Sequence, residues 1–192
     1  MRAKSISLVK IFAALLFLGN VSLLAQLTNN DMVHYRDQTN GFVIWYPKIW
    51  AKVPETLPST KLKVVSRAGL GNCDFSVTVL SNPIYRSMTA AKATELVLKN
   101  PEALLARLKR EYPDAKIIQL IETKLNNRAA YSVTFDATFR SVGVDVPMRF
   151  LMVSSVDGDR AFTLIGRAPP EEFENTRPEF LLMMSGFRTT QN

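Results

Sequence analysis

The chain has 192 residues, 47% of them hydrophobic, and a formal net charge of +7. This composition is typical of a globular protein of one or two domains and excludes a disordered chain and a multi-span membrane protein. The single cysteine and single histidine exclude a scaffold of intrachain disulfides and metal sites built from several thiolates or imidazoles.

The first 25 residues have the pattern of a secretory signal peptide. Three basic residues precede an unbroken apolar run over 11–18, and the small residue Ala25 follows, which predicts cleavage after Ala25 and a periplasmic or secreted location. The alternative is an uncleaved anchor, although residues 11–25 are shorter than the roughly 20 apolar residues that span a bilayer. Cleavage would lower the net charge to about +4, too small an excess to predict nucleic acid binding.

The mature chain reads as an irregular lead-in over 26–40 followed by a single domain over 41–190. An aromatic and β-branched run at 42–46, stopped by Pro47, predicts a first strand. Apolar residues alternate with polar ones at 62–68 and 73–81, and this period of two predicts two further strands, separated by proline and glycine turns.

Helical spacing replaces the alternation over 88–98 and again over 101–112, where Asn100 is in position to cap the second helix. Alternating segments then return and predict an antiparallel meander of four strands, at 116–125, 131–140, 144–155 and 160–167, with a hairpin turn at Asn126-Asn127. A last helix is predicted from Glu171, restarting at Pro178. The predicted fold class is therefore α+β, an antiparallel sheet of about seven strands covered by helices.

Two segments carry a resemblance to a known family. Tyr35-Arg36-Asp37 leads to Gly-Phe-Val-Ile-Trp-Tyr-Pro-Lys-Ile-Trp at 41–50, and Met-Ser-Gly-Phe-Arg at 184–188 closes the last helix. Together they resemble the opening and the end of the PsbP-like family of extracytoplasmic proteins, in which Ser and Phe are adjacent where Gly186 separates them here. The resemblance implies an α+β sandwich and an accessory role at membrane complexes, with no shared catalytic residues and no cofactor.

Candidate catalytic residues are few. Cys73 belongs to the apolar side of its strand and is expected to be a core thiol, and His34 to be solvated in the lead-in. A hydrolase that uses Cys73 or a buried serine with His34 is the enzymatic alternative. Asp157 and Asp159 flank Gly158 and are interpreted as a tight turn, since the further ligands of a calcium loop are missing.

Trp45 and a basic strand face formed by Lys61, Lys63 and Arg67 are the residues expected to meet a partner, although Trp45 also fits a core position. The sequence thus predicts an exported, non-enzymatic accessory or binding protein without cofactor, docking on an unidentified protein partner, at a membrane surface or complex. A membrane-tethered structural domain that keeps its leader is the second alternative.

Overall fold

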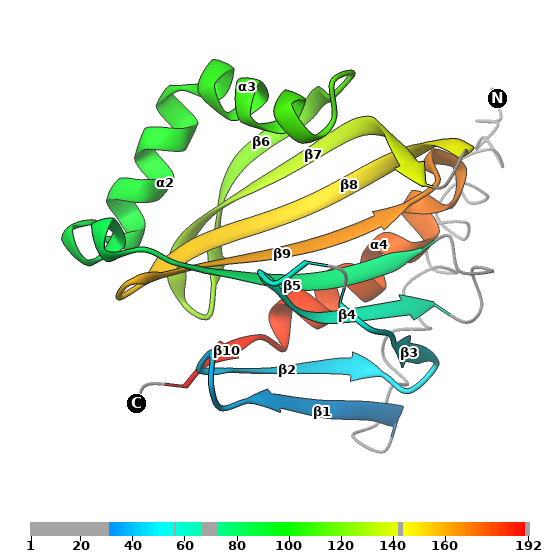
Figure 1. The fold of residues 1–192 in the computed structure, drawn as a ribbon, viewed down its shortest axis with the longest axis horizontal. Coiled ribbons are helices and arrows are strands. Elements are labelled where there is room, and N and C mark those ends of the chain that lie inside the picture. Colours follow the sequence, from blue (N-terminus) through cyan, green and yellow to red (C-terminus); the bar gives the residue numbers. More distant parts are fainter. Residues whose placement is uncertain (1–30, 56, 67–72, 142–143, 191–192) are drawn as a thin grey trace, which may run out of the picture. The chain divides into compact units, whose positions relative to one another are not determined.

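The computed structural model describes residues 31–55, 57–66, 73–141 and 144–190, so the predicted signal peptide lies outside the described residues. A seven-stranded antiparallel sheet forms the centre of the fold, in the order β3-β4-β5-β9-β8-β7-β6 (Figure 1). Its strands are β3 (Trp50–Lys52), β4 (Thr60–Ser66), β5 (Asp74–Ser81), β6 (Lys116–Leu125), β7 (Arg128–Ser141), β8 (Val144–Asp157) and β9 (Arg160–Ala168). The predicted fold class is confirmed.

The four strands β6 to β9 are neighbours in chain order, as the meander predicts. Asn126 and Asn127 join β6 to β7 with positive φ angles of 52° and 62°, the backbone of a tight hairpin turn that suits the right-handed twist of strands. Gly158 has a φ of 61° in the turn between β8 and β9. The predicted turns at both positions are confirmed.

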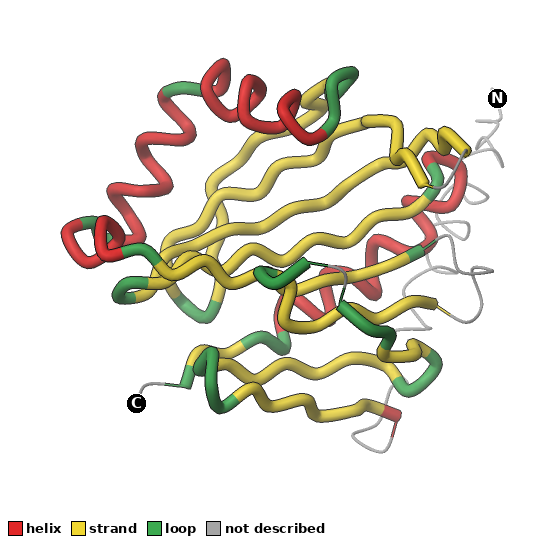
Figure 2. The backbone as a smooth tube through the Cα atoms, in the orientation of Figure 1, coloured by secondary structure: helices red, strands yellow, loops and turns green. Residues whose placement is uncertain are grey.

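A second, three-stranded sheet has the order β1-β2-β10 (Figure 2), with β1 (Met32–Asp37), β2 (Phe42–Pro47) and β10 (Arg188–Thr189). The prediction of an irregular lead-in is wrong over β1, because Val33 and Tyr35 pack against the main core and hold the segment extended. The strand predicted at 42–46 exists as β2, but it belongs to this smaller sheet, and β3 takes its place in the larger one.

Among the described residues, the α-helices α2 (Ala90–Lys99), α3 (Pro101–Glu111) and α4 (Pro170–Ser185) accompany the short 3-10 helix η3 (Pro83–Ser87). The Asn100 side chain accepts a hydrogen bond from the Ala103 amide at 3.3 Å and caps α3 as predicted. Pro178 does not restart the last helix but lies inside the continuous α4. The buried Phe173 and Phe180 on either side of it hold the axis in place despite the amide hydrogen that proline lacks.

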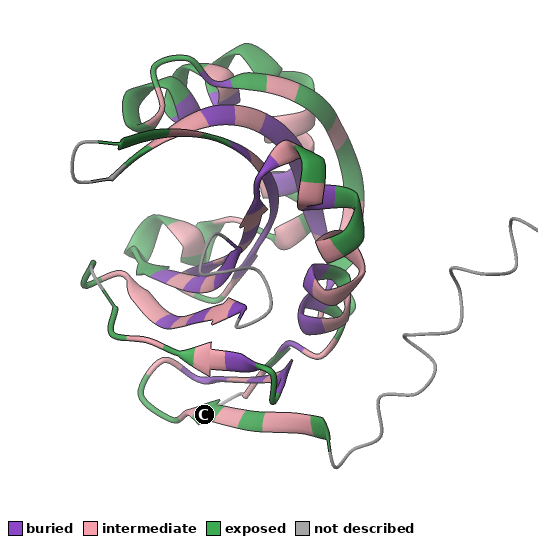
Figure 3. Ribbon diagram, turned by 90° about the vertical axis from the view of Figure 1, so that its right-hand side faces the viewer, coloured by how far each residue is buried: buried purple, intermediate pink, exposed green. Residues whose placement is uncertain are grey.

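The two faces of the seven-stranded sheet have separate cores. On one face, side chains of β2, β5 and β9 pack against α4, with Phe42, Phe75 and Phe180 fully buried. On the other, α2 and α3 cover the strands β6 to β8, and Leu104 and Leu108 pack there against the apolar residues of β7 and β8. Burial alternates along β4 and β9, whereas the central strands β7 and β8 contain runs of consecutive buried residues (Figure 3), as expected where both faces of a sheet are covered.

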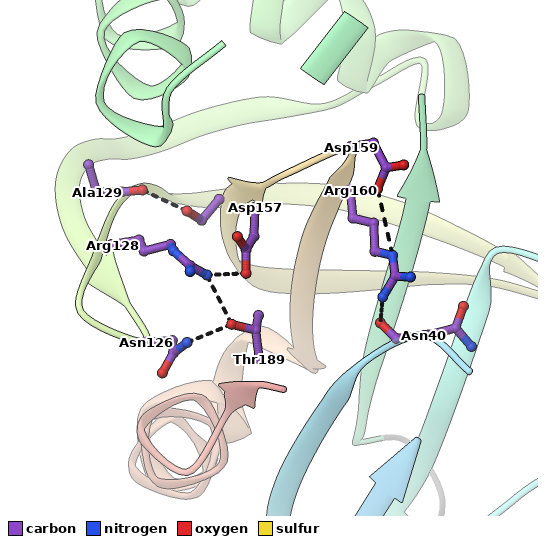
Figure 4. Close-up of polar contacts among 9 residues, drawn as sticks. Asn40, Asn126, Arg128, Ala129, Asp157, Asp159, Arg160 and Thr189 are labelled. Carbon is purple, nitrogen blue, oxygen red and sulfur yellow. Dashed lines mark hydrogen bonds and ion pairs between the residues drawn. The ribbon is translucent and has the colours of Figure 1, made fainter. Parts of the chain in front are cut away.

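A polar cluster attaches the small sheet to the end of the large one (Figure 4). Arg128 donates to Thr189 Oγ1 at 2.9 Å and also contacts Asp157. Arg160 donates to the Asn40 carbonyl oxygen at 2.8 Å. The bond of Arg128 to Thr189 spans 61 positions of the chain, and that of Arg160 to Asn40 spans 120, so both join segments that the sequence keeps far apart.

No helix among the described residues is long and apolar enough to cross a membrane.

Candidate binding groove

The helices α2 and α3 cover only part of their face of the seven-stranded sheet, the part formed by β6 to β8. A groove of about 440 Å³ lies on the same face. Alternate residues of β5, β8 and β9 form its floor, and α3 contributes Arg107, Leu108 and Glu111 to one side. Leu57, which precedes β4, and Tyr85 of η3 also line the groove. The volume is within the range of ordinary small-ligand sites.

One side of the groove is charged. Asp74 of β5 accepts a hydrogen bond from Arg167 Nε of β9 at 2.8 Å, with a second contact from the same guanidinium group. Lys63 Nζ of β4 lies 3.5 Å from Asp74 Oδ2. The Asp74 and Arg167 side chains are only 10% and 12% exposed, and that of Lys63 is 22% exposed, so the three groups form a largely desolvated cluster with one excess positive charge.

Arg167 is fixed from a second direction as well. Its guanidinium carbon lies 3.5 Å from the centroid of the Phe139 ring, where the negative face of the ring attracts a cation. Because a carboxylate and an aromatic ring both hold the group, it is preorganised within the groove.

The other side of the groove is aromatic. Phe135 and Phe150 stack at a centroid distance of 4.6 Å, and Tyr112 lies 5.0 Å from Phe150. Burial, followed by the charge of Glu111, raises the pKa of Tyr112 above its ordinary value of 10.0. The phenol therefore stays protonated and remains a hydrogen-bond donor at physiological pH.

Of the predicted partner-binding residues that the structure describes, one belongs to the groove lining and two do not. Lys63 lines the groove, whereas Lys61 donates to the Pro58 carbonyl oxygen at 2.6 Å, and Arg67 lies outside the described residues. A register shift between Thr60 and Leu62 in the pairing of β4 with β5 interrupts the regular alternation that placed both lysines on one face.

Trp45 is half-buried on β2 and is not part of the main core. Its ring meets His34 edge to face at a centroid distance of 5.1 Å. Gly186, just after α4, passes so close that an added Cβ would lie 3.3 Å from the Trp45 Cβ. The tryptophan therefore packs on a local surface of the small sheet, away from the groove lining.

Cys73 is a buried core thiol, as predicted. Its sulfur donates to Glu172 Oε2 at 3.4 Å, and burial raises its pKa to about 11, so it stays protonated at neutral pH and is a poor nucleophile. His34 is exposed and packs on Trp45. The Cys73–His34 version of the hydrolase alternative loses its support.

The aspartates of the Asp157-Gly158 turn are held by arginines. Asp157 contacts Arg128, and Asp159 accepts from Arg86 at 2.8 Å. Within the described part of the chain, no group of three or more metal-ligating side chains comes together. The turn interpretation of the aspartates is confirmed.

Sequence reasoning missed the groove, whose charged pair comes from Asp74 and Arg167, 93 positions apart. A signal was present, because Ser76, Thr78 and Thr163 alternate with apolar residues. That pattern is identical for a strand face open to solvent and for one that lines a groove.

No profile of a known protein family matches the sequence, and no curated protein matches it. Solved structures do share its fold. The cyanobacterial PsbP (CyanoP) of Synechocystis sp. PCC 6803 is 15% identical and aligns with a TM-score of 0.59, covering 85% of this chain and 95% of its own. LpqN, which is involved in cell envelope biogenesis of Mycobacterium tuberculosis, is 12% identical with a TM-score of 0.51, covering 83% and 91%.

A point mutant of the protein Mog1 is similar to the same extent, with 11% identity, a TM-score of 0.51 and coverage of 84% of this chain and 97% of its own. At these identities the likeness concerns the fold alone. The PsbP-like α+β fold expected from the two end segments is therefore confirmed.

Proposed function

We propose that the protein is exported and acts as a non-enzymatic accessory protein, binding a component of the cell envelope in the groove. The observation that carries this proposal is the half-covered groove itself, with a charged side and an aromatic side on a rigid sheet. Ligand sites are typically preformed concave surfaces of this mixed character.

The charged groups of the groove favour binding over bond-making. Asp74 is engaged by the cations of Lys63 and Arg167, so its carboxylate is committed to structural partners. Arg107 donates to the Tyr131 hydroxyl at 3.1 Å and is likewise committed to a structural partner. Groups held in this way are suited to orient a ligand.

Export rests on the leader sequence, and a retained leader that tethers the domain is the alternative. Mass spectrometry of the protein purified from its native source separates the two, since cleavage gives an N-terminus at Gln26 and a tether keeps Met1. A full-length, cytosolic protein would contradict export. Trp45, Lys61 and Arg67 are proposed to contact a protein partner, and the first two are not part of the groove lining.

The role of the groove is tested with a matched pair of variants on β5. Thr78→Phe places a ring in the groove, whereas Ser81→Phe adds the same ring at an exposed position of the same strand outside it. We expect affinity capture from the native envelope to recover the same component with the wild type and with Ser81→Phe, but not with Thr78→Phe. Equal recovery by all three folded proteins would exclude the groove as the binding site.

A further inference from the structure

A row of hydroxyl groups crosses the groove floor from strand to strand. The register pairs Thr60 with Thr78, Thr78 with Thr163, Thr163 with Ser154, and Ser154 with Tyr131. These residues belong to five neighbouring strands, β4, β5, β9, β8 and β7. Neighbouring strands lie about 4.8 Å apart, so the row offers hydroxyls at a regular spacing, and all but that of Tyr131 line the groove.

Strand stability does not explain this row. Valine suits a sheet as well as threonine does and buries more apolar surface. Ser154 and Thr163 bond each other at 2.9 Å, while Thr60 and Thr78 are half-buried at the groove surface. A hydroxyl both donates and accepts, so the row is suited to a ligand that itself carries several groups of this kind.

Further along the strands, the next row changes from polar to apolar across the groove. Lys63 pairs with Ser76, Ser76 with Ile165, and Ile165 with Met152. A ligand that lies across this row meets an ammonium and a hydroxyl at one edge and aliphatic side chains at the other. It must therefore have a polar rim and an apolar face.

The same floor disfavours a peptide and a simple anion. Strands β5, β9 and β8 are each paired on both sides, so they offer no free backbone edge to which an extended peptide could add. The positive charges of Lys63 and Arg167 are partly neutralised by Asp74 between them, which weakens attraction for a carboxylate or phosphate.

We infer that the groove binds a short neutral saccharide, a mono- or disaccharide unit. The hydroxyl rim of the sugar bonds Thr78, Thr163 and Lys63, and its C–H face lies on Ile165 and Met152. This inference rests on the groove being the binding site proposed above and names the class of ligand. The unit can be a free sugar or the end of an envelope glycan, since both present the same ring.

The test is calorimetric titration of the full mature protein with neutral hexoses, N-acetylhexosamines and their disaccharides. Glucuronate and a neutral tripeptide serve as the competing ligand classes, and isolated envelope glycan fragments distinguish a polymer end from a free sugar. We expect saturable binding of at least one neutral sugar. The double variant Thr78→Val/Thr163→Val, which keeps the shape and removes two hydroxyls, is expected to weaken it at least tenfold.

The control is Thr123→Val on β6, a threonine outside the groove lining, which should bind the sugar like the wild type. The inference is overturned if no neutral sugar binds, if glucuronate or the tripeptide binds instead, or if the double variant binds as tightly as the wild type. Such a result leaves the proposed function intact as long as Thr78→Phe still abolishes envelope capture. If Thr78→Phe does not affect capture of the envelope component, the proposed function itself fails, whatever the sugar titration shows.

Discussion

Removal of the Asp74 carboxylate tests the charged side of the groove. Asp74→Asn keeps the shape of the side chain but leaves Lys63 and Arg167 facing each other, at 22% and 12% exposure. Loss of one partner of a buried ion pair costs about 3–5 kcal/mol, because the remaining charge stays desolvated. Since water reaches the groove and Phe139 still holds the guanidinium, we expect a loss of about 2–3 kcal/mol.

In a chain of this size each kcal/mol lowers the melting temperature by about 2–4 °C, so the variant should melt about 4–12 °C below the wild type. Urea denaturation followed by circular dichroism gives the free energy of unfolding directly. The control is Asp145→Asn, because Asp145 pairs with Arg140 at 3.7 Å where the two side chains are 65% and 69% exposed. Such surface pairs contribute at most about 1 kcal/mol.

The double variant Asp74→Asn/Arg167→Met removes the unpaired guanidinium and should recover a large part of the lost stability, because an apolar replacement of a buried pair is often neutral. An Asp74→Asn protein as stable as the wild type would refute the assignment of a desolvated cluster. So would equal losses for Asp74→Asn and Asp145→Asn, since the two pairs differ mainly in burial.

Three other predictions concern the core under α4, the thiol and the link between the sheets. Gly166→Ala should lower the free energy of unfolding, measured in urea, by about 1–3 kcal/mol, because the new Cβ would lie within 2.7 Å of the buried Phe180 ring. In a Phe180→Leu background the same substitution should lower it by less, and an equal loss would contradict the clash. Burial raises the pKa of Cys73 to about 11, so the thiol should resist iodoacetamide at pH 8 in the native protein and react in urea, whereas rapid alkylation of the native protein at pH 8 would show an accessible thiolate. The free energy of unfolding should also fall as the pH rises from about 9, the ordinary thiol pKa, to about 11, because the buried thiol resists ionisation in the folded state. Arg128→Met should lower the free energy of unfolding by about 1–2 kcal/mol and speed amide exchange in β10, because the hydrogen bond to Thr189 is lost. Hydrogen exchange with mass spectrometry measures this, and unchanged exchange in β10 would mean that the polar cluster does not hold the small sheet.

Local patterns in the sequence identified most of the secondary structure. The alternation in β7, the paired asparagines before it and the Asn100 cap all depend on residues within one turn or one strand. Such signals act over a few residues, so they can be recognised without knowing the fold.

Sheet membership could not be recognised in this way. Residues 42–46 form an aromatic and β-branched run that would suit a strand of the main sheet, yet β2 pairs with β10 near the other end of the chain. Likewise Trp50 belongs to β3 of the larger sheet, where it packs against Phe180 at a centroid distance of 5.9 Å. Long-range packing of this kind overrides local preference.

By itself, the sequence determined the succession of strands and α-helices from β4 to α4, the core position of Cys73 and the turn at Gly158, because each depends on local periodicity or backbone freedom. The tertiary structure alone decided which polar strand residues face a groove, since only the pairing register aligns Thr60, Thr78 and Thr163. It also placed Asp74 against Arg167. An alternating pattern says that one face of a strand is polar, but what that face meets depends on segments distant in the chain.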